Sequence, residues 1–347
     1  MATSRLLRPA NLRPTNLLTK RTLSTSPFAP RHLLSIADLT PQELTKLILN
    51  AASHKTSIKS AAGISNSSFQ LQDALKGQNI ALMFTKRSTR TRVSTESAVT
   101  LLGGHPMFLG SQDIQLGVNE SLMTSAIVAR VDAHEDVASL AKYSSVPVIN
   151  ALSDGFHPLQ TIADFLTVHE AFPSSQGGKG GLGLEGLKIA WVGDANNVLY
   201  DLAIGAAKLG VQISVATPKG YGIPAEFREI ITSASISSVL TETNVPEEAV
   251  KNADIIVTDT WVSMGQEQEK AKRLKDFAGF QVTKELAQRG GAKEGWRFMH
   301  CLPRKPEEVS DEVFYSPASL VFPEAENRLW SALAVLEGFV VNKGKIV

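Results

Sequence analysis

The amino-acid sequence predicts an α/β fold made of two doubly wound parallel-sheet domains joined by interdomain helices. Its 347 residues are enough for about two domains. Short apolar runs alternate with segments of helical periodicity, which is the pattern of strands and helices in a parallel sheet. A Gly- and Ser-rich stretch at 173–186 interrupts this alternation, which then begins again. We therefore expect one domain on each side of that stretch.

The first half of the chain carries the signals of four strands and four helices. Thr40 and Glu43 have the spacing of a capping box, and Pro41 suits a first helical position, so a helix is expected near the start of the fold. The expected helices cover 37–52, the residues after 88, 135–143 and 157–171, and the expected strands cover 79–84, 106–109, 126–131 and 146–151.

The second half repeats the alternation of strands and helices. The expected strands cover 188–193, 212–216, 254–261 and 297–302, and the expected helices cover 197–209, 246–252 and 323–340. These elements predict a first domain at 34–172, a surface insertion at 173–186, a second domain at 187–322, and a C-terminal helix at 323–347 that packs back on the first domain.

Composition excludes several classes of protein. The net charge is +1, so there is no electrostatic basis for nucleic acid as a partner. With 43% hydrophobic residues, the chain has no apolar run near the roughly 18 residues of a membrane span. Cys301 is the single cysteine, which excludes an internal disulfide and a site built from several cysteines. A reducing compartment is the default expectation.

The first 30 residues differ from the rest of the chain. They are rich in Arg, Ser and Thr, and the first acidic residue of the chain is Asp38. This composition predicts a mitochondrial transit peptide at 1–30, with cleavage between Arg21 and Arg31 and a mature protein in the mitochondrial matrix. The alternative is a disordered basic tail without a targeting role.

The stretch at 84–92 is the strongest candidate for a binding site. An apolar run leads into it and a helical pattern leaves it, so Ser88 and Thr91 should lie at a strand-to-helix turn. A helix start offers free N–H groups to an anion, and Arg90 can hold two phosphate oxygens at once. The alternative is an N-cap with solvated arginines. One face of this helix is expected to carry Val93, Ser97, Thr100 and Leu101.

Four motifs resemble those of the aspartate/ornithine carbamoyltransferase family. Ser-Thr-Arg-Thr at 88–91 resembles the family's carbamoyl-phosphate motif, and His-Pro-Leu-Gln at 157–160 resembles its His-Pro-x-Gln motif. Asp-Thr-Trp-Val-Ser-Met-Gly at 259–265 looks like the loop of the ornithine-specific members, and His-Cys-Leu-Pro-Arg at 300–304 looks like their counterpart of a His-Pro-Leu-Pro run. The resemblance extends from about residue 34 to about residue 336.

The resemblance implies a carbamoyl-phosphate site in the first domain. His157 stands at a helix start, where a neutral imidazole can donate to a carbonyl, and Gln160 lies one turn further on. Arg130 ends an apolar strand, where a charge needs a partner. The implied ligands are Ser88, Thr89, Arg90, Thr91, Gln115, Arg130, His157, Gln160 and Arg328, with Gln115 reaching a neighbouring subunit's site.

The second domain is expected to hold the amino acid. The resemblance implies contacts to ornithine from Asn197, Asp259, Ser263, Met264, Cys301 and Leu302. It makes Arg90, Arg130, His157 and Cys301 the catalytic set, without a covalent role for Cys301, because the implied transfer is direct. Taken by itself, Cys301 is more simply a small buried hydrophobic residue.

The implied reaction is attack of the δ-amine of ornithine on carbamoyl phosphate, which gives citrulline and phosphate for arginine biosynthesis. The resemblance implies no metal or organic cofactor and a homotrimer with shared active sites. Only the neutral amine, with a free pKa of about 10, is nucleophilic. Turnover should therefore rise with pH above neutrality in initial-rate assays, and a flat profile with rate-limiting chemistry would contradict this expectation.

One segment departs from the family pattern. Family members carry about two further helical turns between the loop at 110–119 and the strand that holds Arg130, so the crossover helix expected near 120–126 is too short for the family pattern. A mispredicted exon boundary, a splice variant or a true deletion would each explain this. The departure puts Arg130, Gln115 and the subunit contact in question, and it makes a catalytically impaired paralogue an alternative.

Two further alternatives remain open. Another carbamoyltransferase could act on aspartate or a different amine, although Asp259 would repel an aspartate side chain. A nucleotide-dependent oxidoreductase is suggested by the turn at 193–196, but that turn lacks the Gly-x-Gly-x-x-Gly pattern.

Overall fold

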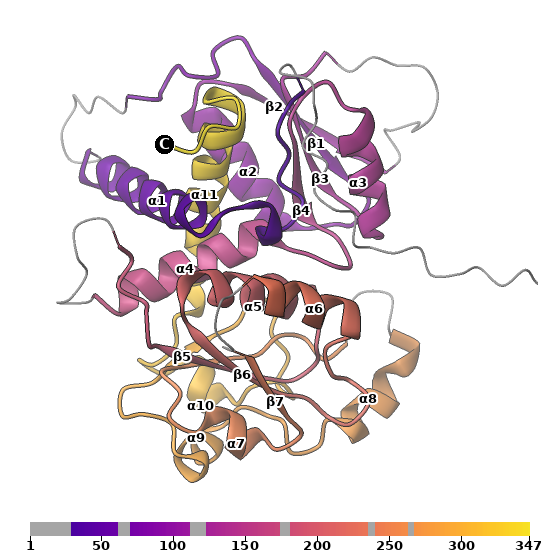
Figure 1. The fold of residues 1–347 in the computed structure, drawn as a ribbon, viewed down its shortest axis with the longest axis vertical. Coiled ribbons are helices and arrows are strands. Elements are labelled where there is room, and N and C mark those ends of the chain that lie inside the picture. Colours follow the sequence, from indigo (N-terminus) through magenta and orange to yellow (C-terminus); the bar gives the residue numbers. More distant parts are fainter. Residues whose placement is uncertain (1–28, 62–69, 112–122, 174–180, 235–239, 263–266) are drawn as a thin grey trace, which may run out of the picture.

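The computed structural model describes residues 29–61, 70–111, 123–173, 181–234, 240–262 and 267–347. These residues form two lobes, each built around a parallel β-sheet, with helices between and around them (Figure 1). The α/β fold class with two parallel-sheet domains is therefore confirmed.

The first sheet is covered by helices on both faces. Its strand order is β2(His105–Gly110), β1(Asn79–Phe84), β3(Ala126–Arg130), β4(Val148–Leu152), all parallel. Alternate side chains point to opposite faces of a strand. Met83 accordingly packs with α3(His134–Tyr143), whereas Leu82 belongs to the main core together with α2(Thr89–Leu101).

The second sheet follows the same plan. Its strand order is β7(Leu240–Thr243), β6(Gln212–Ala216), β5(Lys188–Val192), β8(Ile255–Val257), β9(Arg297–Met299), again all parallel. Trp191 faces the main core beside α5(Asn197–Leu209). Val192 faces a second core with α7(Pro246–Val250) and α9(Lys284–Gly290).

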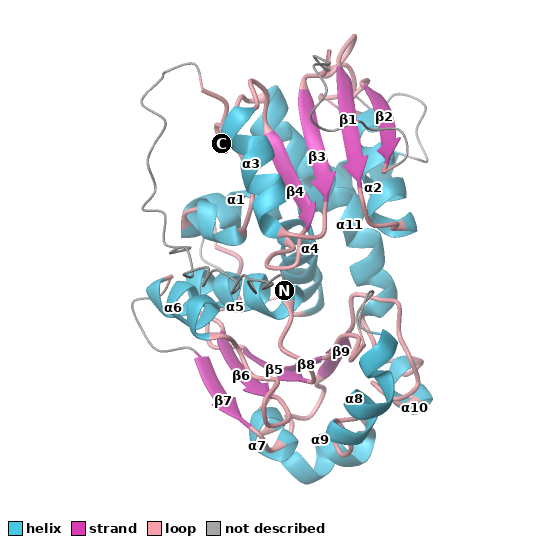
Figure 2. Cartoon of the chain, turned by 90° about the vertical axis from the view of Figure 1, so that its right-hand side faces the viewer, coloured by secondary structure: helices cyan, strands magenta, loops and turns pink. Residues whose placement is uncertain are grey.

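Long helices connect the two lobes. α11(Val321–Leu336) packs against α1(Pro41–Ala61), α2 and α4(Pro158–Ala171), and α4 also packs against α5. Figure 2 shows α11 running from the second sheet up to α2 beside the first sheet. A π-helical turn, Glu337–Val341, follows α11. The largest hydrophobic core, which contains Leu333 and Trp191, is thus continuous across both lobes.

One local prediction, the capping box, is confirmed, and the predicted face of one helix is wrong. The capping box is present, because the Thr40 N–H donates to Glu43 at 2.8 Å and the Glu43 N–H donates to Thr40 Oγ1 at 3.2 Å. In α2, however, Val93 is 55% exposed. The buried face instead carries small and polar residues, which a search for apolar periodicity overlooks. They are Thr91, Ser94, Thr95, Ala98 and Val99.

The structure also contains short elements that the sequence analysis did not predict. They are the 3₁₀ turns Ile36–Asp38 and Glu267–Glu269, the helices α6(Ala225–Ser233), α8(Lys270–Asp276) and α10(Asp311–Phe314), and also β7 and α9.

Some predictions fall outside the described residues. Residues 1–28 of the expected transit peptide, Gln115, Ser263, Met264 and most of the short crossover near 120–126 are among them. Among the described residues, no helix is both long and apolar enough to cross a membrane.

Arg31 fastens the start of the fold to its end. Its guanidinium donates to Glu43 at 2.5 and 2.9 Å, to the Gly344 carbonyl at 3.1 Å and to the Asp38 carbonyl at 3.2 Å. The Arg31 hydrogen bond lowers the pKa of Glu43 to about 2. The stabilisation from this ionised carboxylate is complete above its ordinary pKa of 4.5 and is lost as pH falls toward 2.

Replacing Arg31 by alanine should therefore lower the free energy of unfolding by about 1–3 kcal/mol at neutral pH. Denaturant titration at pH 7 and at acidic pH measures this loss, which should shrink in acid. The control is Arg289→Ala, which removes an exposed pair with Glu247 and should cost less. Equal effects of the two substitutions would contradict the assigned role of Arg31.

Candidate active site

The predicted site residues that the structure describes come together between the lobes, at the carboxyl ends of strands from both sheets. The segments that follow β1, β3 and β4 face those that follow β5, β8 and β9. Ligands in open α/β sheets bind at this edge, because the loops there are free of the sheet and helices begin in them.

The start of α2 is capped, and its arginine reaches the other lobe. Ser88 is the N-cap and accepts from the Thr91 N–H at 3.3 Å, so the capping interpretation is correct for this residue. The same interpretation expected Arg90 to be solvated, and this part of it is wrong. It donates to the carbonyls of Cys301 at 2.8 Å and Leu302 at 2.5 Å. Thr89, the first residue of the helix, is exposed.

Three arginines gather beside this helix start, and none of them pairs with an acid in the part of the chain that the structure describes. The Nε atoms of Arg90, Arg130 and Arg328 are buried and have no hydrogen-bond partner among the described residues. Burial, with Arg90 nearby, lowers the pKa of Arg130 to about 10. Burial and the other two arginines lower the pKa of Arg328 to about 10 as well. A bound anion would compensate these charges.

His157 faces the same cluster as a neutral imidazole. Burial lowers its pKa well below the ordinary value, and Arg328, Arg130 and Arg90 lower it further. Its Nδ1 is buried without a partner among the described residues. Its backbone N–H donates to Asp201 at 2.8 Å, which fixes the residue at the start of α4. A neutral imidazole can donate one hydrogen bond to a carbonyl oxygen.

Gln160 lies one turn further along α4 and is fully engaged. Its Oε1 accepts from Arg328 at 2.6 Å. Its Nε2 donates to Asp164 at 2.7 Å and to Glu324 at 3.1 Å. Arg328 also donates to Thr91 Oγ1 at 3.2 Å. Helices α2, α4 and α11 therefore meet in one hydrogen-bonded network at the anion site.

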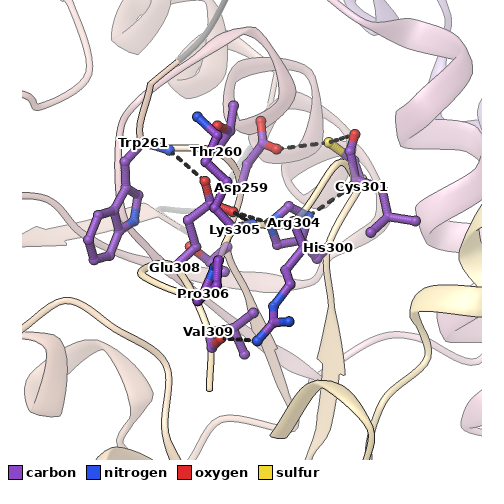
Figure 3. Close-up of polar contacts among 12 residues, drawn as sticks. Asp259, Thr260, Trp261, His300, Cys301, Arg304, Lys305, Pro306, Glu308 and Val309 are labelled. Carbon is purple, nitrogen blue, oxygen red and sulfur yellow. Dashed lines mark hydrogen bonds and ion pairs between the residues drawn. The ribbon is translucent and has the colours of Figure 1, made fainter. Parts of the chain in front are cut away.

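The second lobe contributes a buried carboxylate. Asp259 follows β8, accepts from Asn196 at 2.8 Å and accepts from the Cys301 thiol at 3.0 Å (Figure 3). It has no cationic partner among the described residues, so it can receive an ammonium group. Asn197 begins α5 and donates to the Ser153 carbonyl at 2.5 Å, which joins the two lobes.

A buried histidine and glutamate support the loop around Cys301. His300 Nε2 lies 3.0 Å from Glu308 Oε2, and the Leu302 N–H donates to His300 Nδ1 at 2.9 Å (Figure 3). These contacts hold Leu302 at φ +59°, a costly conformation for a large side chain. The ligand atoms of Asp259, His300 and Cys301 lie within 4.8 Å of one another, close enough for a metal, but each is engaged in a protein hydrogen bond.

The Cys301 thiol is held in its neutral form. Removal from water raises its pKa well above the ordinary value, and the Asp259 carboxylate raises it further. A raised pKa means less thiolate than in a free cysteine at every pH, so the thiol should be a poor nucleophile. This agrees with the expectation that Cys301 forms no covalent intermediate.

The native protein should therefore react slowly with iodoacetamide. At pH 8, alkylation is expected to be at least about tenfold slower than in the urea-unfolded chain. Mass spectrometry gives a clean measurement, because Cys301 is the single cysteine. A native rate equal to or above the unfolded rate would show an activated thiolate instead.

Several residues of this site escaped the sequence analysis. They are Asn196, which holds Asp259, Asp201, which holds His157, and the buried acids Asp164, Glu324 and Glu308. Asn196 could have been found as the N-cap of α5. The others depend on contacts between residues far apart in the chain.

Fold and site together define a two-lobed α/β protein in which a cluster of arginines, uncompensated among the described residues, lies near a buried carboxylate. Two family models match the chain: the carbamoyl-P binding domain of aspartate/ornithine carbamoyltransferase over residues 31–170, and the Asp/Orn binding domain of the same family over residues 185–339. The chain belongs to the aspartate/ornithine carbamoyltransferase family.

Individual relatives agree with this assignment. The mitochondrial ornithine carbamoyltransferase of Aspergillus terreus is 68% identical over 338 residues, covering 94% of this chain and 92% of the relative. The mitochondrial enzyme of the same name from Schizosaccharomyces pombe is 54% identical over 329 residues, covering 92% and 97%. The crystal structure of a mitochondrial ornithine carbamoyltransferase from Coccidioides immitis has a TM-score of 0.83 and 63% identity, covering 92% of this chain and all of that one.

Proposed function

We infer that this protein transfers the carbamoyl group of carbamoyl phosphate to the δ-amine of L-ornithine, giving L-citrulline and phosphate. The observation that carries this proposal is the cluster of three arginines around a neutral histidine, opposite Asp259. The Nε atoms of these arginines are buried and have no partner in the part of the chain that the structure describes. Such a cluster suits a dianionic substrate with a carbonyl group next to the phosphate. The high identity to curated ornithine carbamoyltransferases supports the same reaction.

Carbamoyl phosphate would bind at the cluster of Arg90, Arg130 and Arg328. Arg90 and Arg328, with Ser88, Thr89 and Thr91 at the start of α2, would hold the phosphate group. Arg130 and His157 would polarise the carbonyl oxygen, and the Gln160 oxygen would accept from the carbamoyl NH₂ group. Arg90 would leave the carbonyls of Cys301 and Leu302 to do so.

Ornithine would bind against the second lobe. Asp259 would take the α-ammonium group, and Asn197 would contact the α-carboxylate. Cys301 and Leu302 would lie beside the δ-amine. Ser263, Met264 and Gln115, the last from a neighbouring subunit, stay predictions from the motifs, since they lie outside the described residues.

The reaction would be a direct acyl transfer. The neutral δ-amine attacks the carbonyl carbon and forms a C–N bond, and the negative charge moves to the carbonyl oxygen, where Arg130 and His157 stabilise it. The carbonyl then re-forms as the C–O bond to phosphate breaks, and phosphate leaves with the electron pair. The proton lost from the nitrogen goes to the leaving phosphate. No step passes through the Cys301 sulfur, because its thiol is neutral.

Location and assembly complete the proposal. The name of the curated relatives includes the word mitochondrial, which supports the mitochondrial matrix and a targeting role for the first residues. We propose the division into domains at 34–172 and 187–322, and a homotrimer. The trimer would cover the edge strand β2 and the exposed side chain of Val93. Light scattering of the purified protein measures this state.

The alternatives of the sequence analysis lose their support. The relatives match over at least 92% of their lengths in the examples above, and nothing in them favours a catalytically impaired variant. The short segment near 120–126 stays a prediction about residues outside the described ranges.

Complementation tests the proposal in a cell. The full-length gene should restore growth without arginine to a fungal strain that lacks its own ornithine carbamoyltransferase, and its His157→Asn variant should not, because it lacks the electrophilic imidazole. Added citrulline should rescue both. Failure of the wild-type gene, with the protein present in the matrix fraction, would contradict the function.

A further inference from the structure

The acids Asp164 on α4 and Glu324 on α11 form a buried pair behind the carbamoyl-phosphate pocket. Asp164 is 2% exposed, as is Glu324, and their carboxyl groups are hydrogen-bonded to each other. Neither carboxyl group forms a hydrogen bond with Arg90 or Arg130 in the described structure. The substrate contacts proposed above do not use them.

The two carboxyl groups must share a proton. Two ionised carboxylates have no hydrogen to place between them, and their repulsion in a buried site is large. Burial raises the pKa of Asp164 to about 7. Burial, together with Asp164, raises the pKa of Glu324 well above its ordinary value. The single proton lies between the two acids, so toward all other neighbours the pair presents only acceptors.

This acceptor surface and Arg328 together fix how the Gln160 amide is turned. An amide can present either its oxygen or its NH₂ group, and its neighbours decide which. Both hydrogens of Gln160 Nε2 are taken, one by Asp164 at 2.7 Å and one by Glu324 at 3.1 Å. Its oxygen must then point the other way, where Arg328 donates to it at 2.6 Å. The Gln160 oxygen is therefore the hydrogen-bond acceptor that faces the arginine cluster.

We propose that Asp164 and Glu324 are positioning residues that set the specificity for the carbamoyl-group substrate. Together with Arg328 they hold the Gln160 oxygen toward the arginine cluster, so that it selects a substrate with an NH₂ group beside the carbonyl. The inference rests on the proposed function. It predicts discrimination against acetyl phosphate, which carries a methyl group where carbamoyl phosphate carries NH₂. The backbone N–H of His300 donates to Glu324 Oε2 at 2.9 Å, so the same pair also ties this site to the second lobe.

Two isosteric substitutions should have opposite outcomes. In Glu324→Gln, the amide oxygen is needed by the His300 N–H, so the new NH₂ group faces Gln160 Nε2. The Gln160 amide then lies between two donors, the new NH₂ group and Arg328, and neither of its orientations satisfies both. In Asp164→Asn, the new NH₂ group replaces the shared proton toward Glu324, and the new oxygen still accepts from Gln160. The orientation of Gln160 is lost in the first variant and kept in the second.

The test measures the KM for carbamoyl phosphate and the inhibition constant of acetyl phosphate at saturating ornithine. Glu324→Gln should raise that KM and lower the discrimination ratio, each about tenfold, whereas Asp164→Asn should stay within about twofold of wild type. Thr167→Val is the stability control, since it removes a buried α4–α11 hydrogen bond to Asn327 two turns from Gln160. It should lower the melting temperature and leave the ratio unchanged.

Unchanged discrimination in Glu324→Gln, or an equal loss in Asp164→Asn, would overturn the inference. Infrared spectroscopy adds a test that needs only Asp164→Asn. Wild type should show the band of the protonated carboxyl group shared by Asp164 and Glu324, and Asp164→Asn should lack this band. A wild type without that band would also overturn the inference. A wild type that forms no citrulline would instead contradict the proposed function, which keeps the two failures distinct.

Discussion

Replacing Arg130 by methionine should make the unliganded protein more stable while it abolishes most of the activity. The Arg130 side chain is buried, donates no hydrogen bond among the described residues, and lies beside Arg90 without a compensating acid. An apolar side chain of similar length removes that repulsion and should add about 1–2 kcal/mol to the free energy of unfolding. It should also lower kcat/KM for carbamoyl phosphate by about 10²–10³-fold, since one donor to the developing oxyanion is lost.

Denaturant titration without ligand and steady-state kinetics test the two halves of this prediction together. Arg289→Met is the matched control, because it makes the same chemical change at an exposed pair with Glu247. The control should change stability by less than about 1 kcal/mol and leave the kinetics unchanged. A destabilised Arg130→Met variant that retains wild-type activity would contradict the assignment of the cluster as the carbamoyl-phosphate site.

Replacing Asp259 by asparagine should weaken the use of ornithine strongly and leave the binding of carbamoyl phosphate nearly unchanged. The carboxylate is 6% exposed and is held by Asn196 and the Cys301 thiol, with its negative charge free to meet an ammonium group. An isosteric neutral amide loses that charge-assisted bond. We expect kcat/KM for ornithine to fall by about a hundredfold or more. The equilibrium affinity for carbamoyl phosphate should change by less than about threefold.

Kinetics with ornithine and calorimetry with carbamoyl phosphate measure the two effects separately. Asp276→Asn is the control, because that exposed carboxylate accepts from the Tyr221 hydroxyl at 2.8 Å and an amide oxygen can do the same. Equal losses of affinity for both substrates in Asp259→Asn would indicate that Asp259 only supports the fold.

The elements that the sequence predicted best carry local signals. β1 and α5 have the predicted bounds, because an apolar run ends at a polar turn in the first case and an N-cap asparagine with a closing glycine frames the second. The face of α2 was wrong because it is buried through small and polar side chains. The half-exposed strand β7 and the short helices α8 to α10 have too few apolar residues for periodicity to detect.

The positions of the candidate site residues on their helices were predictable, but the residues that support them were not. The motifs placed Arg90, His157 and Gln160 correctly at helix starts or within the first turn. The carboxylates that hold them are distant in the chain: Glu324 lies 164 positions from Gln160, and Asp201 lies 44 from His157. Sequence spacing carries no information on such contacts, since they arise only when the lobes pack together.

Citrulline formation by the purified protein is the decisive measurement of its activity. The assay supplies carbamoyl phosphate with ornithine, or with aspartate as the control acceptor. We expect citrulline with ornithine and no carbamoylated product with aspartate, because Asp259 attracts an ammonium group and repels a second carboxylate. A folded protein that carbamoylates aspartate, or neither acceptor, would contradict this expectation.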